Sequence, residues 1–470
     1  MTVALVAGFM TLLDVSIVNV ALPAIRADLD LSPGALQWVL SGYALTFGLL
    51  LVPAGRFGDA RGRRDVFMVG LAVFTLASAA AGLATSATWL IVARLVQGAA
   101  AGVVNPQVSG LVQQLFKPQE RGRPFGLLGA TIGISTAVGP LLGGLLIQIF
   151  GAEQGWRWIF FINVPIGLAA ILLGRAWIPA RGEEQKERES LDPVGVLLLG
   201  AGVLLLLLLL PLVQEREWQG PAKWLLLVAA AAVLAGFVAW ERRYARTGTP
   251  VIDLGLFAVR SYSLGALIGL LYFAGFTTIF FIYTIYLQNG LHYSALLAGL
   301  AVTPFALGSA VAAAAGGRVV NRYGRPLVAA GLILVAAGLA GTLLALSLVP
   351  GHQAGWAAAF PLLIAGIGSG LVISPNQTLT LAKVPVERAG SAGAVLQTGQ
   401  RIGTAVGIAV VGAVFFNRLA GTGGDYSVAV RTGLLVTLGL VIIALAAALV
   451  DVISARPATA KHVAGTFSPR

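Results

Sequence analysis

The sequence contains no cysteine and little charge. The absence of cysteine excludes disulfide bonds, thiolate nucleophiles and cysteine-ligated metals. Asp, Glu, Lys and Arg together make up 11% of the 470 residues, whereas soluble domains carry about 25%. The chain therefore has too little charge to cover a water-facing surface of its size, and an ordinary soluble enzyme is excluded.

Groups that carry out chemistry are also scarce. The three histidines, His292, His352 and His462, fall in predicted loops or in the tail. No predicted span contains a pair of carboxylates, and no Gly-x-x-x-x-Gly-Lys-Ser/Thr segment occurs. The sequence therefore gives no support to an enzyme, a metal site or an ATP-driven pump, and we expect no cofactor.

Apolar residues and glycine dominate the chain instead. Hydrophobic residues make up 57% of the sequence, the mean hydropathy is +0.88 and there are 60 glycines. Segments of about 20 apolar residues span a bilayer as helices, and glycine allows such helices to pack closely. The composition therefore predicts an all-α polytopic membrane protein with fourteen spans, near residues 2–21, 35–54, 66–85, 88–111, 125–148, 157–177, 193–212, 222–240, 262–287, 293–315, 327–348, 356–378, 390–416 and 431–452.

The basic residues predict the orientation of these spans. If the N-terminus is cytoplasmic, 23 of the 31 Lys and Arg residues fall in cytoplasmic segments and 6 in outer ones. This bias is the positive-inside signal of a cell-membrane protein with both termini in the cytoplasm. It also accounts for the formal net charge of +12 without any nucleic-acid partner.

An internal repeat divides the chain. The loop Gly55–Arg63 recurs as Gly317–Arg325, with glycine, arginine and Asp/Asn at the same offsets. Both copies are predicted to be cytoplasmic, which indicates parallel repeats, as in transporters built from two six-helix bundles. We therefore expect an N-terminal bundle at 1–178, two additional helices with cytoplasmic linkers at 179–261, a C-terminal bundle at 262–455 and a cytoplasmic tail at 456–470.

The same loop resembles the signature of the major facilitator superfamily. Four further segments resemble its fourteen-helix drug:proton antiporter branch: Leu13–Pro23, Arg94–Gly98, Gly139–Gly144 and Trp156–Pro165. The resemblance implies a proton-coupled secondary transporter that exports lipophilic small molecules by alternating access. A dedicated exporter of one metabolite, natural product or lipid-like compound is the alternative. We expect protons, a lipophilic substrate and the lipid bilayer as partners, and a functional monomer.

Asp14 and Arg94 are the candidate coupling residues. Asp14 is the only carboxylate well inside a span, about 20 Å from the inner end of its helix at 1.5 Å per residue. Arg94 enters from the outer side to nearly the same depth of a core about 30 Å thick. The resemblance implies that Asp14 binds the coupling proton and that Arg94 tunes its proton affinity. A purely structural ion pair is the alternative.

The resemblance also implies a conformational latch in the repeated loop. Its carboxylate, Asp59, is expected near Gly390–Ser391, where a helix begins in the other half and its dipole favours an anion. The second copy has an amide at this position and is expected to latch more weakly. The latch residues are Gly55, Asp59, Gly62, Arg63, Arg64, Asn321 and Arg325. The antiporter packing motif comprises Gly139, Pro140, Gly143 and Gly144.

Polar and aromatic residues within the spans are candidates for the substrate cavity. Residues three, four, seven or eleven apart share a helical face, which groups Arg94 with Gln97 and Asn105, and Gln397 with Arg401. Interhelical packing contacts are the alternative for each of them. The cavity candidates are Asn19, Gln97, Asn105, Tyr283, Gln397, Gln400 and Arg401. With one deep carboxylate against two deep arginines, we expect neutral, monocationic or zwitterionic lipophilic molecules to be better substrates than dications.

Overall fold

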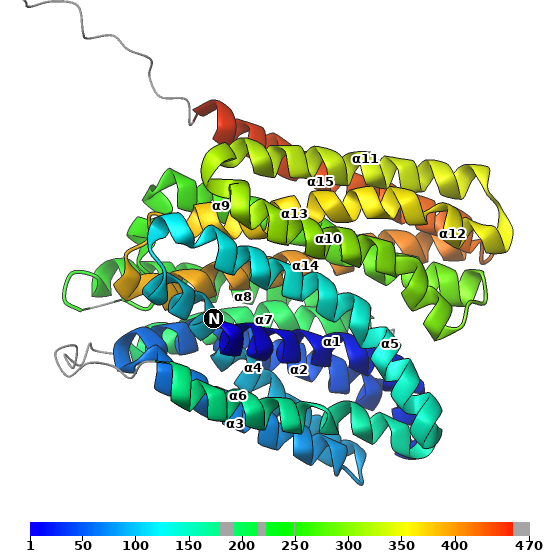
Figure 1. Ribbon diagram of the computed structural model, residues 1–470, viewed down its shortest axis with the longest axis horizontal. Coiled ribbons are helices and arrows are strands. Elements are labelled where there is room, and N and C mark those ends of the chain that lie inside the picture. Colours follow the sequence, from blue (N-terminus) through cyan, green and yellow to red (C-terminus); the bar gives the residue numbers. More distant parts are fainter. Residues whose placement is uncertain (179–191, 215–221, 249, 455–470) are drawn as a thin grey trace, which may run out of the picture.

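The chain folds into a bundle of long helices. The computed structural model describes residues 1–178, 192–214, 222–248 and 250–454 (Figure 1). The expected tail at 456–470 and the linker residues 179–191 lie outside the described residues. Within the described ranges, no strand is present. Thirteen helical segments are long and apolar enough to cross a membrane, and the described apolar part of α7, Pro193–Leu205, adds a shorter one.

The helices fall into three sets. The first half contains α1 (Thr2–Asp28), α2 (Pro33–Arg61), α3 (Arg63–Gly82), α4 (Ala87–Leu115), α5 (Gly122–Phe161) and α6 (Asn163–Trp177). Two further helices follow, α7 (Pro193–Gln214) and α8 (Ala222–Tyr244). The second half contains α9 (Arg260–Ile285), α10 (Ala295–Tyr323), α11 (Arg325–Leu348), α12 (Ala354–Ala357), α13 (Ala359–Leu381), α14 (Ala389–Gly421) and α15 (Tyr426–Ser454).

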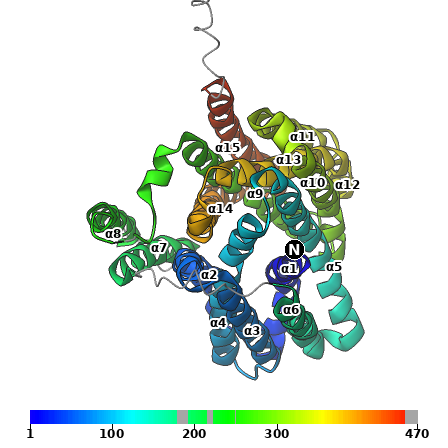
Figure 2. The same ribbon diagram turned by 60° about the vertical axis from the view of Figure 1, so that its left-hand side comes forward.

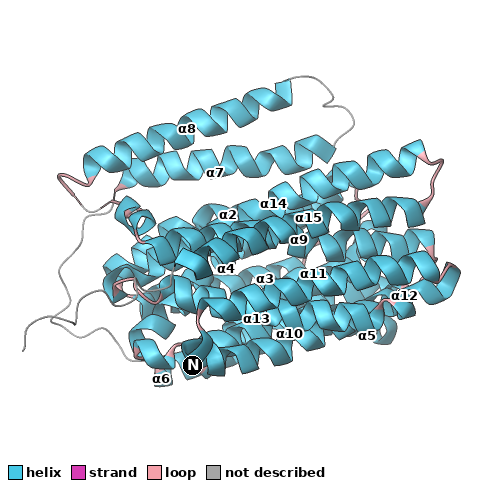
Figure 3. Ribbon diagram, turned by 90° about the horizontal axis from the view of Figure 1, so that it is seen from above, coloured by secondary structure: helices cyan, strands magenta, loops and turns pink. Residues whose placement is uncertain are grey.

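Two pairs of helices make the most extensive contacts between the two halves. In one pair α5 packs against α10, and in the other α2 packs against α14. Figure 2 shows α7 and α8 to one side of the bundle, and Figure 3 shows α8 as the outermost helix there. Within this added pair, α7 contacts α8, α2 and α14. Asp192 holds the pair together, because its carboxylate accepts a hydrogen bond from the indole of Trp240 at 2.9 Å.

The repeated loops form tight turns because of their glycines. Gly62 separates α2 from α3 with φ of 111°, and Gly324 separates α10 from α11 with φ of 57°. Side chains other than glycine rarely adopt positive φ. The recurrence of glycine at this offset is therefore a requirement of the backbone.

Glycine also brings the two halves into contact beside these loops. A Cβ on Gly55 would lie 2.7 Å from the carbonyl oxygen of Gly390 at the start of α14. A Cβ on Gly317 would lie 2.3 Å from the carbonyl oxygen of Gly122 at the start of α5. Each repeated loop thus rests against the first turn of a helix from the opposite half. We call the end of the bundle where these contacts lie the basic end.

The contact of α14 with α9 predicts a sharp difference between two substitutions on α14. A Cβ on Gly407 would lie 1.9 Å from the carbonyl oxygen of Ala274, whereas Gly399 has no heavy atom within 4 Å of its Cβ position. We expect Gly407→Ala to lower the thermal midpoint of the purified protein, because overpacking costs about 1–3 kcal/mol. The matched variant Gly399→Ala should leave the midpoint unchanged or raise it slightly. Equal losses in both variants would contradict this packing.

Candidate functional site

An ion pair lies at the centre of the first half. Nη1 of Arg94 on α4 donates to Oδ2 of Asp14 on α1 at 2.5 Å. Both side chains are buried, with exposed fractions of 1% for Arg94 and 0% for Asp14. Nε of Arg94 donates to the carbonyl oxygen of Val39 on α2 at 3.2 Å. The pair predicted from the depths of the two residues is therefore present.

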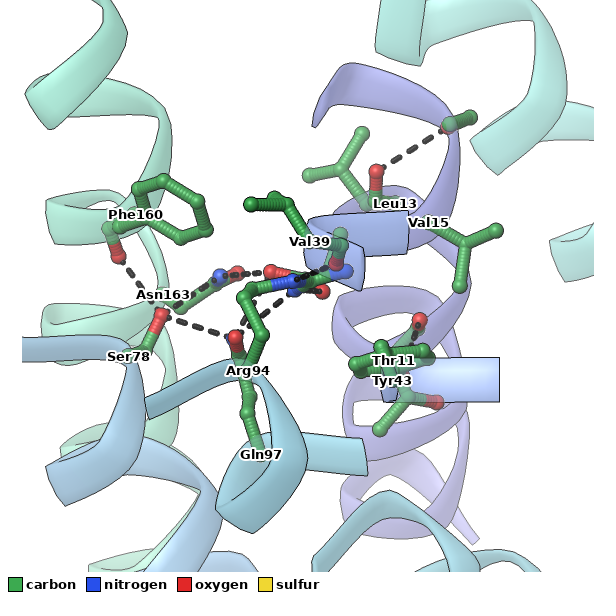
Figure 4. A network of polar contacts seen from close by, with 12 residues as sticks. Thr11, Leu13, Val15, Val39, Tyr43, Ser78, Arg94, Gln97, Phe160 and Asn163 are labelled. Carbon is green, nitrogen blue, oxygen red and sulfur yellow. Dashed lines mark hydrogen bonds and ion pairs between the residues drawn. The ribbon is translucent and has the colours of Figure 1, made fainter. Parts of the chain in front are cut away.

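Amide and hydroxyl groups complete the shell around the carboxylate (Figure 4). Oδ1 of Asp14 accepts hydrogen bonds from Nε2 of Gln97 at 2.8 Å and from Nδ2 of Asn163 at 3.1 Å. The same two nitrogens donate to Oγ of Ser78, at 3.1 Å and 3.0 Å. In addition, Oε1 of Gln97 accepts from Arg94 at 2.8 Å. Four helices, α1, α3, α4 and α6, thus meet at one carboxylate.

Aromatic rings cover the guanidinium group of Arg94. Its central carbon lies 4.2 Å from the ring centroid of Tyr43 on α2 and 5.7 Å from that of Phe160. The hydroxyl of Tyr43 donates to the carbonyl oxygen of Thr11 at 3.3 Å. Cation–π contacts of this kind contribute about 2 kcal/mol when desolvated. The site is therefore a network buried from solvent in which the charges of Asp14 and Arg94 balance. A proton is the smallest species that could enter it and change its net charge.

Sequence reasoning missed three members of this network, Ser78, Asn163 and Tyr43. Asn163 lies inside the Trp156–Pro165 segment that carries part of the family resemblance. The resemblance therefore singles out the segment, but it does not predict the hydrogen bond from Asn163 to Asp14. Ser78 and Tyr43 carry no signal of their own, because a single hydroxyl within an apolar span is common in packed membrane helices.

Several cavity candidates occupy other positions than expected. Gln97 is fully buried in the Asp14 network, so in this structure it supports the ion pair. Tyr283 is 1% exposed and donates its hydroxyl hydrogen to the carbonyl oxygen of Gly355 at 3.0 Å. The aromatic side chains of α9 near it pack into the core of the second half. In this structure Tyr283 packs in the core, and interhelical packing, the alternative to a cavity position, describes both residues.

The remaining candidates on α1 and α4 each donate to a carbonyl group of their own helix, and Nδ2 of Asn105 also donates to Oγ of Thr11 on α1 at 3.5 Å. Nδ2 of Asn19 donates to the carbonyl oxygen of Val15 at 3.1 Å, and its side chain is exposed. Nδ2 of Asn105 donates to the carbonyl oxygen of Ala101 at 3.0 Å and is only partly buried.

On α14 the polar face lies at the boundary between the halves. Nε2 of Gln397 donates to Oγ of Ser109 on α4 at 3.3 Å. The guanidinium carbon of Arg401 lies 4.4 Å from the ring centroid of Phe47 on α2. Gln400 is partly buried on the side facing α9, since its Cγ lies 3.7 Å from the Cβ position of Gly269. These three residues therefore face neighbouring helices of both halves.

The glycines of α5 bring this helix against α1 beside the coupling site. A Cβ on Gly139 would lie 2.0 Å from Oγ of Ser16, and one on Gly143 would lie 3.1 Å from the carbonyl oxygen of Ile17. Pro140 contacts the second half instead, 3.1 Å from the Cβ position of Gly299 on α10. No heavy atom lies within 4 Å of the Cβ position of Gly144. Three of the four motif residues therefore make close interhelical contacts.

At the basic end, Asp59 makes the contact that the resemblance implies. Its Oδ1 accepts from the backbone N–H of Gly390 at 3.0 Å, and its Oδ2 accepts from that of Ser391 at 2.8 Å. Nη2 of Arg63 donates to the same carboxylate at 2.8 Å and also to the carbonyl oxygen of Val386. A charge-assisted hydrogen-bond network thus joins the end of α2 to the start of α14.

Arg64 belongs to the same loop but stays within the first half. Its Nη2 donates to the carbonyl oxygen of Arg175 at 2.9 Å, near the end of α6. Arg64 therefore anchors the loop to its own half, whereas Asp59 and Arg63 reach across the boundary.

The second copy of the loop makes weaker contacts across the boundary. Nδ2 of Asn321 donates to the carbonyl oxygen of Gln119, in the short helix η1 (Pro118–Glu120) before α5. Arg325 turns back into its own half, where its Nε lies 2.8 Å from Oδ2 of Asp451 on α15. Its Nη1 also donates to Oδ1 of Asn376 at 3.0 Å. The partner Asp451 was not foreseen, because it lies 126 positions away with no repeated signal.

The fold and this arrangement define a secondary transporter. Residues 4–408 match the sequence profile of the Major Facilitator Superfamily. The chain belongs to this family. Solved structures with the same fold include the human organic anion transporter MFSD10 and the proton:xylose symporter XylE, with TM-scores of 0.68 and 0.65 at 15% sequence identity. These alignments cover 95% of this chain, 98% of the former and 93% of the latter.

Relatives by sequence are transporters and not enzymes. The probable actinorhodin transporter of Streptomyces coelicolor is 38% identical over 420 residues, which cover 89% of this chain and 72% of that protein. The tetracenomycin C resistance and export protein of Streptomyces glaucescens is 33% identical, with coverage of 87% and 74%. The multidrug resistance protein Stp of Mycobacterium tuberculosis is 32% identical, with coverage of 88% and 75%.

The contacts of Asp59 predict an effect on closure of the basic end. Asp59→Asn removes an anion from the start of α14, a change of about 0.3–2 kcal/mol depending on burial, and leaves Arg63 without its ionic partner. We expect the closed population to fall several-fold. Spin labels on Lys117→Cys and Lys383→Cys, both exposed and in opposite halves, report the distance across this end.

The control for this experiment is Asn321→Ala. Asn321 makes one amide–carbonyl hydrogen bond, so its loss should shift the distance distribution less than Asp59→Asn does. An unchanged distribution in Asp59→Asn, or a larger shift in Asn321→Ala, would contradict the latch.

Proposed function

We propose that this protein exports lipophilic small molecules by alternating access, in exchange for protons. The observation that carries the proposal is the sealed carboxylate of Asp14, whose only ionic partner among the described residues is Arg94. Ionisable groups inside membrane proteins are costly and mark proton or substrate pathways. The export and resistance names of the relatives support the direction of transport. In this proposal the proton gradient supplies the energy, and no cofactor is needed.

Protonation of Asp14 links the gradient to conformation. Removal of one partner from a buried ion pair costs about 3–5 kcal/mol, because the other charge stays unpaired. A protonated Asp14 would leave Arg94 in that state, so the surrounding helices gain by opening to admit water. Four helices meet at this carboxylate, and its protonation state therefore biases the packing of the whole first half.

The closed basic end completes the cycle. We infer that this end faces the cytoplasm, because the segments predicted to lie on its side of the membrane carry 23 of the 31 Lys and Arg residues. Both termini are then cytoplasmic. Closure there by Asp59 corresponds to the state that releases substrate outward. Because the coupling network and the latch both lie within one chain, a monomer suffices for this cycle.

The breadth of substrates distinguishes two forms of the proposal. The names of the relatives include both a multidrug resistance protein and exporters of single natural products. Expression in a pump-deficient bacterial host, challenged with a panel of structurally unrelated toxic compounds, tests breadth directly. We expect resistance to several compounds, which would be absent from Asp14→Asn. Resistance to one compound or to none would favour the dedicated exporter.

The role of Asp14 in coupling is separated from a structural role by a double substitution. Asp14→Asn alone leaves Arg94 buried and unpaired, so both roles predict a loss of transport. Asp14→Asn combined with Arg94→Gln removes both charges, and the double variant should regain the thermal midpoint lost by the single one. We expect it to bind substrate but to show no proton-driven accumulation in inverted vesicles.

The control is the passive exchange of substrate in the same vesicles without a pH gradient. Exchange should persist in the double variant, because it needs no proton. Full proton-driven accumulation by the double variant would show that the pair is structural only.

A further inference from the structure

A second deep arginine lies at the boundary between the halves without an ionic partner. Arg401 lies twelve residues into α14, about 18 Å from the start of the helix at 1.5 Å per residue. Among the residues that the structure describes, it makes no ion pair and no side-chain hydrogen bond, and its guanidinium carbon lies 4.4 Å from the ring centroid of Phe47. Its side chain is partly exposed. Its guanidinium group therefore retains N–H donors that no protein group uses.

Aromatic rings connect this arginine to the coupling site. Phe47 and Tyr43 are one turn apart on α2, with centroids 6.1 Å apart and planes inclined by 20°. Arg401 lies over Phe47 at 4.4 Å and Arg94 lies over Tyr43 at 4.2 Å. Each ring thus contacts one of two cations, and only Arg94 has a carboxylate beside it.

The charge balance at this boundary is consequently positive. Asp14 neutralises Arg94, and the described spans place no second carboxylate beside Arg401. A cation–π contact offsets only part of the desolvation of a guanidinium group. A bound anion would supply the remainder, because the planar fork of arginine binds carboxylate and phenolate oxygens through paired, charge-assisted hydrogen bonds.

The residues around Arg401 could contact the uncharged part of an anionic ligand. Gln397 lies four residues before it on α14 and Thr404 lies three residues after it, so all three share one face. The hydroxyl of Thr404 is hydrogen-bonded to that of Thr277 on α9 at 3.0 Å. Phe47 presents an aromatic surface on the opposite side of the boundary. This combination of one cation, neutral polar groups and an aromatic ring fits a flat, lipophilic molecule with a single acidic group.

We propose that Arg401 binds the acidic group of the substrate and that the preferred substrates are lipophilic aromatic monoanions, carrying a carboxylate or an ionised phenol. This inference rests on the export function proposed above and narrows its substrate class. The aromatic body of the substrate would contact Phe47. Lipophilic cations would bind less tightly than anions with the same aromatic body.

Three fluorescent probes with the same aromatic body test the inference. They are pyrenebutyrate, its neutral primary amide and a pyrenebutyl-trimethylammonium cation. We measure equilibrium binding of each probe to the full-length protein in nanodiscs. The wild type should bind the carboxylate at least about tenfold more tightly than the amide, since each charge-assisted hydrogen bond contributes about that factor. It should bind the cation most weakly.

Substitutions of Arg401 identify the source of the preference. Arg401→Gln should bind carboxylate and amide equally, and Arg401→Lys should keep part of the preference, because it retains the charge but loses the planar fork. Arg418→Gln is the matched control, since Arg418 is an exposed arginine on the same helix. It should behave as the wild type does. If Arg401→Gln does not fold, the lysine variant and the three-probe comparison on the wild type still decide the question.

Failure of this inference is distinguishable from failure of the export function. Equal binding of the three probes, tighter binding of the cation, or an unchanged preference in Arg401→Gln would overturn the role of Arg401. Transport of the amide or the cation by wild-type vesicles under a pH gradient would in that case leave the export function intact. Absence of gradient-driven transport for every probe and every compound of the resistance panel would contradict the export function itself.

Discussion

The first half is organised by the need to satisfy one buried carboxylate. An unpaired carboxylate in a membrane-embedded core costs several kcal/mol, a large part of the net stability of a typical domain. Asp14 avoids this cost through donors from α4 and α6, which are themselves fixed by Ser78 on α3. The backbone of α2 holds the arginine in place. Five of the six helices of this half are therefore positioned by the same charge, and α5 is added through its glycine contacts with α1.

The boundary between the halves obeys a different constraint, that of close backbone approach. Gly55 against Gly390 and Gly317 against Gly122 are equivalent contacts made by the two copies of one loop. The polar contacts placed on them are not equivalent. A carboxylate accepts two backbone N–H groups of α14, whereas an amide donates to a carbonyl group before α5. The steric fit is symmetric and the electrostatic fit is not, so the strength of closure is set mainly on the side of α2 and α14.

The sequence predicted those features that depend on local pattern or on a repeated spacing. Spans follow from apolar length, the meeting of Asp14 with Arg94 follows from depth, and the contact of Asp59 with Gly390 and Ser391 follows from the family resemblance. Asn163 and Asp451 were missed because their partners are distant in sequence and nothing periodic marks them. The position of Tyr283 could not be decided from the sequence for a related reason. An aromatic side chain on a buried helix has the same pattern whether it faces a cavity or the core, and only the carbonyl group of Gly355 decides between them.

The distribution of charge constrains how proton and substrate can be coupled. A proton on Asp14 adds positive charge near the boundary, and by electrostatics alone this would strengthen the binding of an anion beside Arg401. Reciprocity then requires the anion to strengthen proton binding as well, which would favour transport of both in one direction. Exchange therefore needs the two ligands to prefer opposite conformations. The element that contacts both sites is α2, through Tyr43 under Arg94 and Phe47 under Arg401. The same helix also ends at the Asp59 latch. A movement of α2 can therefore close the basic end of the bundle and, at the same time, move Tyr43 and Phe47 away from the two arginines.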